Sequence, residues 1–281
     1  MKKTALSAAL LAIASALVLS SCDAMFNTNV FKSAGLGQYN IANTDMSSAS
    51  SVSAAAANSP TNFYSQLASD PTKKSTAIAA LTAPGASNDN LVLAATIQIK
   101  TTDAGTVVDN IASQLPTLAK ASGSSFNPAT AISAILPATI TAQISSPTPP
   151  AAFDAMVAGF LGASSNITTV VNSGATLPAV PGGTNQDTAY IGLVSLAVSA
   201  IQPTTTSGAV IPNPTPSQVS TALWQAVQSS QAGTTTTTTT TPFAINTAVF
   251  DMTAPAPGAQ PSTAYSLLGT AGIDPTKLAA K

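Results

Sequence analysis

The chain has few of the residue types that commonly do chemistry in proteins. It contains no histidine and a single cysteine, Cys22. Histidine is the usual general base near neutral pH and the most common ligand of transition metals. Neither a Ser-His-Asp nor a Cys-His catalytic arrangement can therefore form, and a zinc site built from cysteine and histidine is excluded as well. We expect no enzymatic activity, no cofactor and no metal site.

The remaining catalytic routes would need paired aspartates or a lysine beside a serine. The aspartates are scattered, and Asp70, Asp103 and Asp274 stand where a predicted helix begins, so we expect them to cap helices. Residues 88–90, Asn-Asp-Asn, lack the downstream acidic ligand of a calcium loop and predict a turn or a helix cap. No serine precedes a lysine with Ser-x-x-Lys spacing. Four lysines are interpreted as solvated charges on helix surfaces: Lys73, Lys74, Lys100 and Lys120.

The first 21 residues have the order of a bacterial export signal. Lys2 and Lys3 supply positive charge, and an uncharged run rich in alanine and leucine follows over residues 5–19. This run is shorter than the roughly 20 apolar residues that a membrane-spanning helix needs. We therefore predict a signal peptide over 1–21. The alternative is an ordinary cleavable signal, or a buried apolar stretch with a chance cysteine.

The run ends in Leu19-Ser20-Ser21-Cys22, which resembles the lipobox of bacterial lipoproteins. This resemblance covers only the first 22 residues. It implies that diacylglycerol is attached to the sulfur of Cys22, that the chain is cleaved before Cys22, and that acyl chains such as palmitate hold the protein to a membrane. Each buried methylene contributes about 0.8 kcal/mol, and one acyl chain alone binds a membrane only marginally. Durable anchoring therefore takes two or three such chains. As the only cysteine, Cys22 has no partner for an intramolecular disulfide, which agrees with lipidation.

The resemblance implies a place in the bacterial cell envelope, outside the cytoplasm, with the membrane as a partner through the lipid on Cys22. Asp23 resembles a signal for retention in the inner membrane of enteric bacteria. Other bacterial groups do not follow that rule, so both the inner and the outer membrane fit.

Charge is sparse along the whole chain. Nine lysines and ten aspartates give a net charge of −1, and neither arginine nor glutamate occurs. Electrostatic attraction to nucleic acid or to anionic lipid depends on clustered positive charge. Since the sequence has no basic patch, we expect no nucleic-acid partner.

Helix signals recur from residue 59 onward. A capping residue followed by proline, which costs nothing in the first turn of a helix, marks five starts. They are Ser59-Pro60, Asp70-Pro71, Asn127-Pro128, Thr215-Pro216 and Asp274-Pro275. Apolar residues then recur with helical spacing. The ranges concerned are 107–118, 132–144, 153–161 and 219–227.

Two further stretches are predicted to be helical. Residues 189–201 are apolar nearly all round and should form a central buried helix, and residues 90–100 also favour a helix, although residues 97–100 alternate like a strand. Pro116 and Pro137 should kink or split their helices. The predicted fold class is all-α, an irregular helical bundle with long loops rich in proline, threonine and glycine.

The predicted organisation has four parts after the signal peptide. They are a lipid-anchored tether over 22–58, a helical domain over 59–232, a threonine-rich linker over 233–242 with eight consecutive threonines, and a C-terminal segment over 243–281 that packs on the helical domain. Within the last part, residues 243–250 are compatible with one short extended segment.

Three functions fit these observations. The leading one is a non-enzymatic envelope lipoprotein with a structural or interaction role, whose helical domain contacts an envelope or extracellular protein. The alternative is an envelope carrier or binding protein for a weakly polar small molecule in a cavity among the helices. The third, an enzyme that uses only Asp, Lys, Ser, Thr or Tyr, has no close carboxylate pair to support it. Trp224, which invites a ligand-stacking role, lies in an apolar helical stripe and is predicted to be a core residue.

Overall fold

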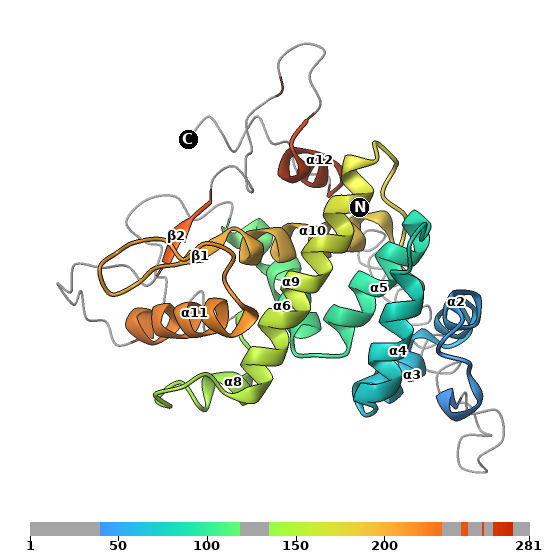
Figure 1. Ribbon diagram of the computed structural model, residues 1–281, viewed down its shortest axis with the longest axis horizontal. Coiled ribbons are helices and arrows are strands. Elements are labelled where there is room, and N and C mark those ends of the chain that lie inside the picture. Colours follow the sequence, from blue (N-terminus) through green and yellow to red (C-terminus); the bar gives the residue numbers. More distant parts are fainter. Residues whose placement is uncertain (1–39, 119–134, 232–242, 247–254, 256–260, 272–281) are drawn as a thin grey trace, which may run out of the picture. The chain divides into compact units, whose positions relative to one another are not determined.

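A computed structural model describes residues 40–118, 135–231, 243–246, 255 and 261–271 (Figure 1). These residues are mostly helical and include one short two-stranded sheet, which confirms the all-α fold class with a minor extended element. The compact unit that holds the helices begins at Ile41. Within the described residues, no helix combines the length and the apolarity needed to cross a membrane.

Two early helices of this unit begin at predicted positions, although only Asp70 caps its helix with a side-chain hydrogen bond and Ser59 makes none. Helix α3 (Pro60–Ala68) follows Ser59, and helix α4 (Pro71–Leu81) follows Asp70, whose carboxylate accepts a hydrogen bond from the backbone N–H of Lys73 at 3.0 Å. Both helices carry proline in the first turn, where its missing N–H has no partner to lose. The cap-and-proline signal therefore located two helix starts correctly.

The range 22–58, predicted to be a tether, contains folded structure at its end. The 3₁₀ helix η2 (Ile41–Asn43) contacts α3, and helix α2 (Ala49–Asn58) packs on α3, α4 and α5 (Asn88–Lys100). The side chain of Val52 is fully buried there. The end of this range therefore belongs to the folded unit, because alanine and serine are typical of linkers but also allow a small helix to pack closely.

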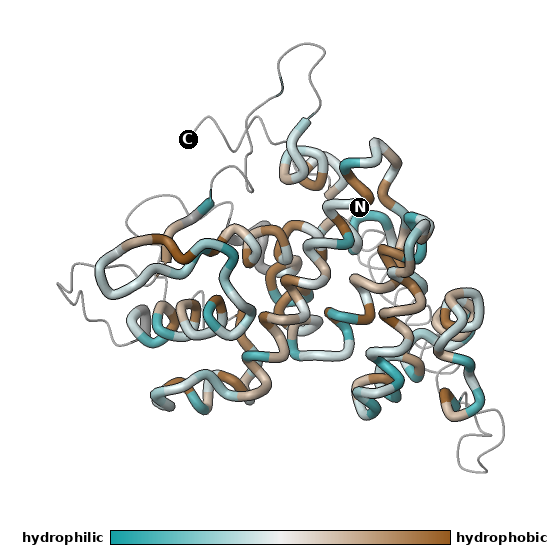
Figure 2. The backbone as a smooth tube through the Cα atoms, in the orientation of Figure 1, coloured by the Kyte–Doolittle hydropathy of each residue, from teal (hydrophilic) through white to brown (hydrophobic). Residues whose placement is uncertain are grey.

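The core is built around helix α9 (Ala151–Asn172), which contacts α5, helix α10 (Asn185–Ser199) and helix α11 (Pro216–Gln231). Figure 2 shows hydrophobic residues gathered along α5, α9 and α10. The predicted stripe at 153–161 supplies Phe153, Met156, Val157 and Phe160 to this core. Seven of the eight residues at 189–196 of α10 are buried and Tyr190 is partly buried, which confirms the predicted buried helix.

Small residues let α5 and α9 approach closely. A Cβ atom added to Gly159 would lie 2.7 Å from the carbonyl oxygen of Gln98, and one added to Gly162 would clash with the Gln98 side chain. The amide of Asn166, one turn further along α9, donates to Gln98 Oε1 at 3.2 Å. Glycine is therefore a steric requirement at Gly159, where the neighbour is backbone.

The two prolines inside predicted helices behave differently. Pro137 stands outside a helix, directly before helix α8 (Ala138–Thr141), so it interrupts the stretch 132–144 as predicted. Helix α6 (Ala104–Leu118) instead continues through Pro116, so the predicted split does not occur there. A proline this close to a helix end removes a single backbone hydrogen bond, which the rest of the helix tolerates.

The extended element pairs two strands from distant parts of the chain. Strand β1 (Ile201–Pro203) runs antiparallel to strand β2 (Phe243–Ile245), with Gln202 opposite Ala244. The expectation of a short extended segment after residue 242 is correct, whereas the helix predicted to reach Ile201 stops at Ser199. Helix α12 (Thr263–Thr270), which the sequence reading missed, packs on α10 and α9.

Candidate functional site

The one residue with a predicted chemical role, Cys22, lies outside the described residues, together with the signal peptide. The same holds for the threonine run over 234–241 and for the helix starts at Asn127-Pro128 and Asp274-Pro275. Lipidation of Cys22 therefore stays a prediction. The described part of the chain shows what a lipid anchor would carry.

Two of the four lysines interpreted as solvated charges are partly buried instead, and one of them makes a hydrogen bond within the protein. Lys73 Nζ donates to the carbonyl oxygen of Ile41 at 2.9 Å, and Gln66 Oε1 accepts from the N–H of the same residue at 2.9 Å. Lys74 is half-buried, and this burial lowers the pKa of its ammonium group. Lys100 is exposed as predicted, and Lys120 is outside the described residues.

The residues considered for catalysis or metal binding have structural roles where they can be followed. Asp70 caps α4, and Asp103 accepts a hydrogen bond from Thr139 Oγ1 at 3.5 Å. Residues 88–90 form the first turn of α5, whose cap is Ser87. Among the described residues, no three acidic, histidine or cysteine side chains lie close enough to hold a metal ion.

Trp224 is a core residue, as predicted. It is fully buried on α11, its ring stands edge-on to Phe153 with 5.0 Å between centroids, and Nε1 donates to the carbonyl oxygen of Ser146 at 2.9 Å. Gln228 Nε2 donates to the same oxygen at 2.7 Å. These bonds pin the segment after α8 to α11 and leave the indole no surface for a ligand.

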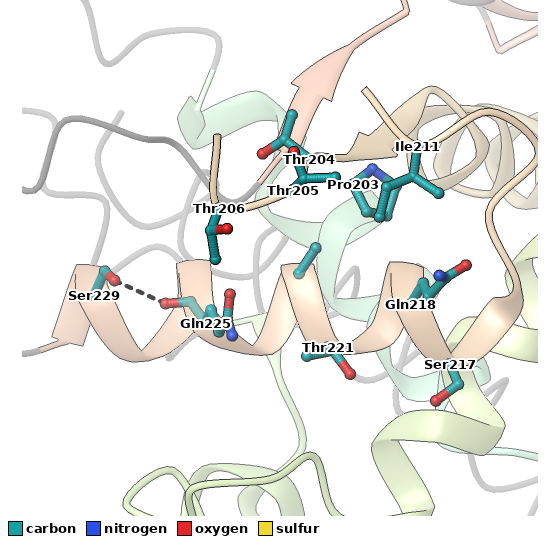
Figure 3. A pocket seen from close by; sticks show the side chains of 11 residues that line it. Pro203, Thr204, Thr205, Thr206, Ile211, Ser217, Gln218, Thr221, Gln225 and Ser229 are labelled. Carbon is teal, nitrogen blue, oxygen red and sulfur yellow. Dashed lines mark hydrogen bonds between the residues drawn. The ribbon is translucent and has the colours of Figure 1, made fainter. Parts of the chain in front are cut away.

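A first hollow, the threonine groove, lies between α11 and the loop that follows β1 (Figure 3). Its volume is about 550 Å³. Its lining consists of Pro203, Thr204, Thr205, Thr206, Ile211, Ser217, Gln218, Thr221, Ala222, Gln225 and Ser229. No lining residue is charged, so the groove offers hydroxyl and amide groups above a small apolar floor. Ser217, Thr221 and Gln225 recur every four residues and therefore share one face of α11.

A second hollow, the tyrosine hollow, has a volume of about 470 Å³. It lies where α3, the end of α5, α6, the turn at 180–183 and the start of α10 meet. The apolar and glycine part of its lining comprises Pro60, Ile99, Gly105, Val108, Ala112, Val180, Pro181, Gly182, Gly183 and Ile191. The polar part comprises Thr61, Tyr64, Ser65, Lys100, Asp109, Asp187 and Tyr190.

Tyr64 is the most unusual polar group in this lining. Its side chain is 6% exposed, and its hydroxyl is buried without a hydrogen-bond partner. Burial raises the pKa of Tyr64 well above its usual range, so the phenol stays protonated and remains a donor. The ring stands edge-on to Phe63, with 5.4 Å between centroids.

Two other polar side chains of the tyrosine hollow already have hydrogen-bond partners within the protein. Asp187 Oδ2 accepts from the backbone N–H of Thr184 at 2.7 Å and from its hydroxyl at 2.9 Å, which closes a capping box at the start of α10. The hydroxyl of Tyr190 accepts from Gln186 Nε2 at 3.1 Å. Lys100 and Asp109 are exposed at this hollow.

Sequence reasoning did not single out Tyr64, Tyr190 or the threonine groove. A buried tyrosine and a core phenylalanine occupy the same kind of position in a helical pattern, so no local signal marks an unpaired hydroxyl. Comparison of the chain with known protein families, with curated proteins and with solved structures gives no match.

Proposed function

We propose that the protein is a bacterial envelope lipoprotein that is held to a membrane by lipid on Cys22 and acts through contacts of its helical unit, without catalysis. The observation that carries this proposal is the order of charged residues, apolar run and Leu19-Ser20-Ser21-Cys22 at the start of the chain. The absence of histidine and of any second cysteine supports a non-catalytic role.

The start of the folded unit fits a role at the end of a tether. Gln66 and Lys73 bind both backbone groups of Ile41, so the chain is fixed to α3 and α4 at this point. About 18 residues separate Cys22 from Ile41. Fully extended, such a segment spans at most roughly 65 Å, which sets the greatest distance between the lipid and the folded unit.

The threonine groove is the surface that we assign to a protein partner. Its hydroxyl and amide groups can both donate and accept hydrogen bonds, as the backbone of an extended polypeptide requires. The lining has no charge, so a partner segment needs no opposite charge to bind there. Figure 3 shows the polar side chains of α11 on one side of the groove and Thr204, Thr205 and Thr206 on the other.

Mass spectrometry of the protein extracted from membranes tests the anchor. We expect a diacylated or triacylated N-terminal Cys22, which is lost in Cys22→Ala together with partition into the detergent phase. The matched control is Ser21→Ala, which keeps a small residue before the cysteine and should remain lipidated. An unmodified terminus on soluble wild-type protein would overturn the anchor.

Cross-linking in intact cells tests the contact surface. Thr221→Lys places a charge in the threonine groove and should remove a cross-linked partner, whereas Thr169→Lys, at an exposed position on α9, should keep it. Identical cross-linked species in both variants would reject the groove as the contact surface. A reproducible hydrolytic activity of the purified protein would contradict the non-catalytic role.

A further inference from the structure

The tyrosine hollow has the size and composition of a small-molecule site. Such sites have volumes of roughly 300–1,000 Å³, mainly apolar walls and a few polar groups that fix orientation, and this hollow has about 470 Å³. Pro60, Val108, Val180 and Ile191 supply apolar wall, and they come from four different segments of the chain. The concavity therefore depends on the tertiary packing of distant segments.

The fold leaves the hydroxyl of Tyr64 unused. A buried hydroxyl loses its bonds to water and normally regains a partner inside the protein. Tyr64 has none, although phenylalanine would fill the same space against Phe63 without that cost. Because Tyr64 lines the tyrosine hollow, a ligand bound there can supply the missing acceptor.

We propose that the tyrosine hollow binds a small neutral molecule with a flat apolar body and a carbonyl, amide or hydroxyl oxygen that accepts from Tyr64. The apolar body lies against Val108, Ile191 and the ring of Tyr190. The charged groups of the lining are Lys100, Asp109 and Asp187. Thr184 binds the Asp187 carboxylate in the capping box, and Lys100 and Asp109 carry opposite charges, so the lining favours neither a cation nor an anion. This proposal goes beyond the proposed function and does not depend on the lipid anchor.

One geometric condition follows from the burial of the hydroxyl. The Tyr64 oxygen is shielded from water in the empty hollow, so the acceptor has to displace the neighbouring side chains slightly to reach it. Tyr64→Phe separates the two parts of the proposal. Occupancy of the hollow tests the site, and the loss of affinity on removal of one oxygen atom tests the hydrogen bond.

Protection of an introduced thiol measures occupancy in the full chain. Ala112→Cys places a thiol on the wall of the hollow, and Ser113→Cys places one on the exposed side of α6 as a matched control. Both positions fall in the tryptic peptide 101–120, so labelling by N-ethylmaleimide is read from one peptide and is independent of Cys22. The probe is benzamide, a neutral ring with a carbonyl acceptor.

We expect benzamide to bind with a dissociation constant on the order of 10 mM, as is usual for a fragment of this size. At 50 mM it should slow labelling at Ala112→Cys several-fold and leave Ser113→Cys unchanged. Adding Tyr64→Phe should weaken the affinity for benzamide about tenfold, which leaves less than about twofold protection at 50 mM, whereas Thr221→Ala in the threonine groove should leave the protection unchanged. Saturation-transfer NMR with benzamide on the unlabelled wild-type and Tyr64→Phe chains gives the same comparison without an introduced thiol.

Three results would overturn the proposal. Equal labelling rates with and without benzamide at Ala112→Cys would reject the site. Stronger protection by benzoate or benzylammonium than by benzamide would reject the neutral ligand class. Equal benzamide affinity in the presence and absence of the Tyr64 hydroxyl would reject the hydrogen bond. Because none of these measurements reports on Cys22, failure of the anchor and failure of this site are distinguishable.

Discussion

Replacement of Tyr64 by phenylalanine should stabilise the empty protein. The hydroxyl is buried and unpaired, and a hydroxyl that leaves water without gaining a hydrogen bond costs about 1–3 kcal/mol. Phenylalanine keeps the ring and its edge-on contact with Phe63, so only the hydroxyl contribution changes. Taking the lower end of this range, we expect the free energy of unfolding to rise by about 1 kcal/mol. For a chain of this size, that raises Tm by about 2–4 °C.

Urea unfolding followed by circular dichroism at pH 7 measures this change. The control is Tyr190→Phe, which removes an exposed hydroxyl that accepts from Gln186, so its free energy of unfolding should stay the same or fall by about 0.5 kcal/mol. A lower urea midpoint for Tyr64→Phe at an unchanged slope would refute the reasoning. It would mean that the Tyr64 hydroxyl has a partner in solution.

Three further predictions concern pH and the packing of the helices. Burial raises the pKa of Tyr64, so above pH about 10, the usual tyrosine pKa, the unfolded chain loses the Tyr64 proton while the folded chain keeps it. The free energy of unfolding of the wild type should therefore fall by up to about 1.4 kcal/mol per pH unit relative to Tyr64→Phe. Urea midpoints of both chains at pH 9 and pH 11 measure this difference. Gly159→Ala should cost about 1–3 kcal/mol because the new Cβ would lie 2.7 Å from a backbone oxygen, whereas Gly269→Ala, which meets open space, should be neutral or stabilising in thermal unfolding. Trp224→Ala should lower the free energy of unfolding by about 3–5 kcal/mol in urea titrations followed by circular dichroism, and the exposed neighbour Gln225→Ala should change it by less than about 0.5 kcal/mol.

The two proposed surfaces differ in how far water reaches their polar groups. The threonine groove is open and lined by uncharged polar groups, so a partner there competes with water for every hydrogen bond. The tyrosine hollow has an apolar wall and one donor that water does not reach. We therefore expect substitutions in the groove to change partner binding with little effect on stability, and substitutions in the hollow to change both.

Much of the helical framework could be predicted because its signals are local. Ser59-Pro60 and Asp70-Pro71 mark real helix starts, since a cap and a proline act within one turn of chain. The apolar stripe at 153–161 faces the core for an equally local reason, the 3.6-residue period of the helix. Even Trp224 could be assigned to the core from its position in such a stripe.

The predictions that failed depend on contacts between distant residues. Lys73 looks like a surface charge until the chain brings the carbonyl of Ile41 within 2.9 Å of its ammonium group. The end of the predicted tether folds because Val52 finds a buried place in the packing of α2. Strand β1 exists only because β2, about 40 residues later in the sequence, pairs with it.

The sequence by itself determined the all-α class, the helix starts at Pro60, Pro71 and Pro216 and the core role of Trp224, because each of these depends on residue types within a few positions of one another. Lipidation of Cys22 is a prediction of the same local kind. Only the tertiary structure decided where the folded unit begins, which lysines are hydrogen-bonded or partly buried, and that five segments enclose the hollow that Tyr64 lines. Whether a buried hydroxyl has a hydrogen-bond partner depends on the residues that surround it in the folded chain. The residues next to it in the sequence do not determine those contacts.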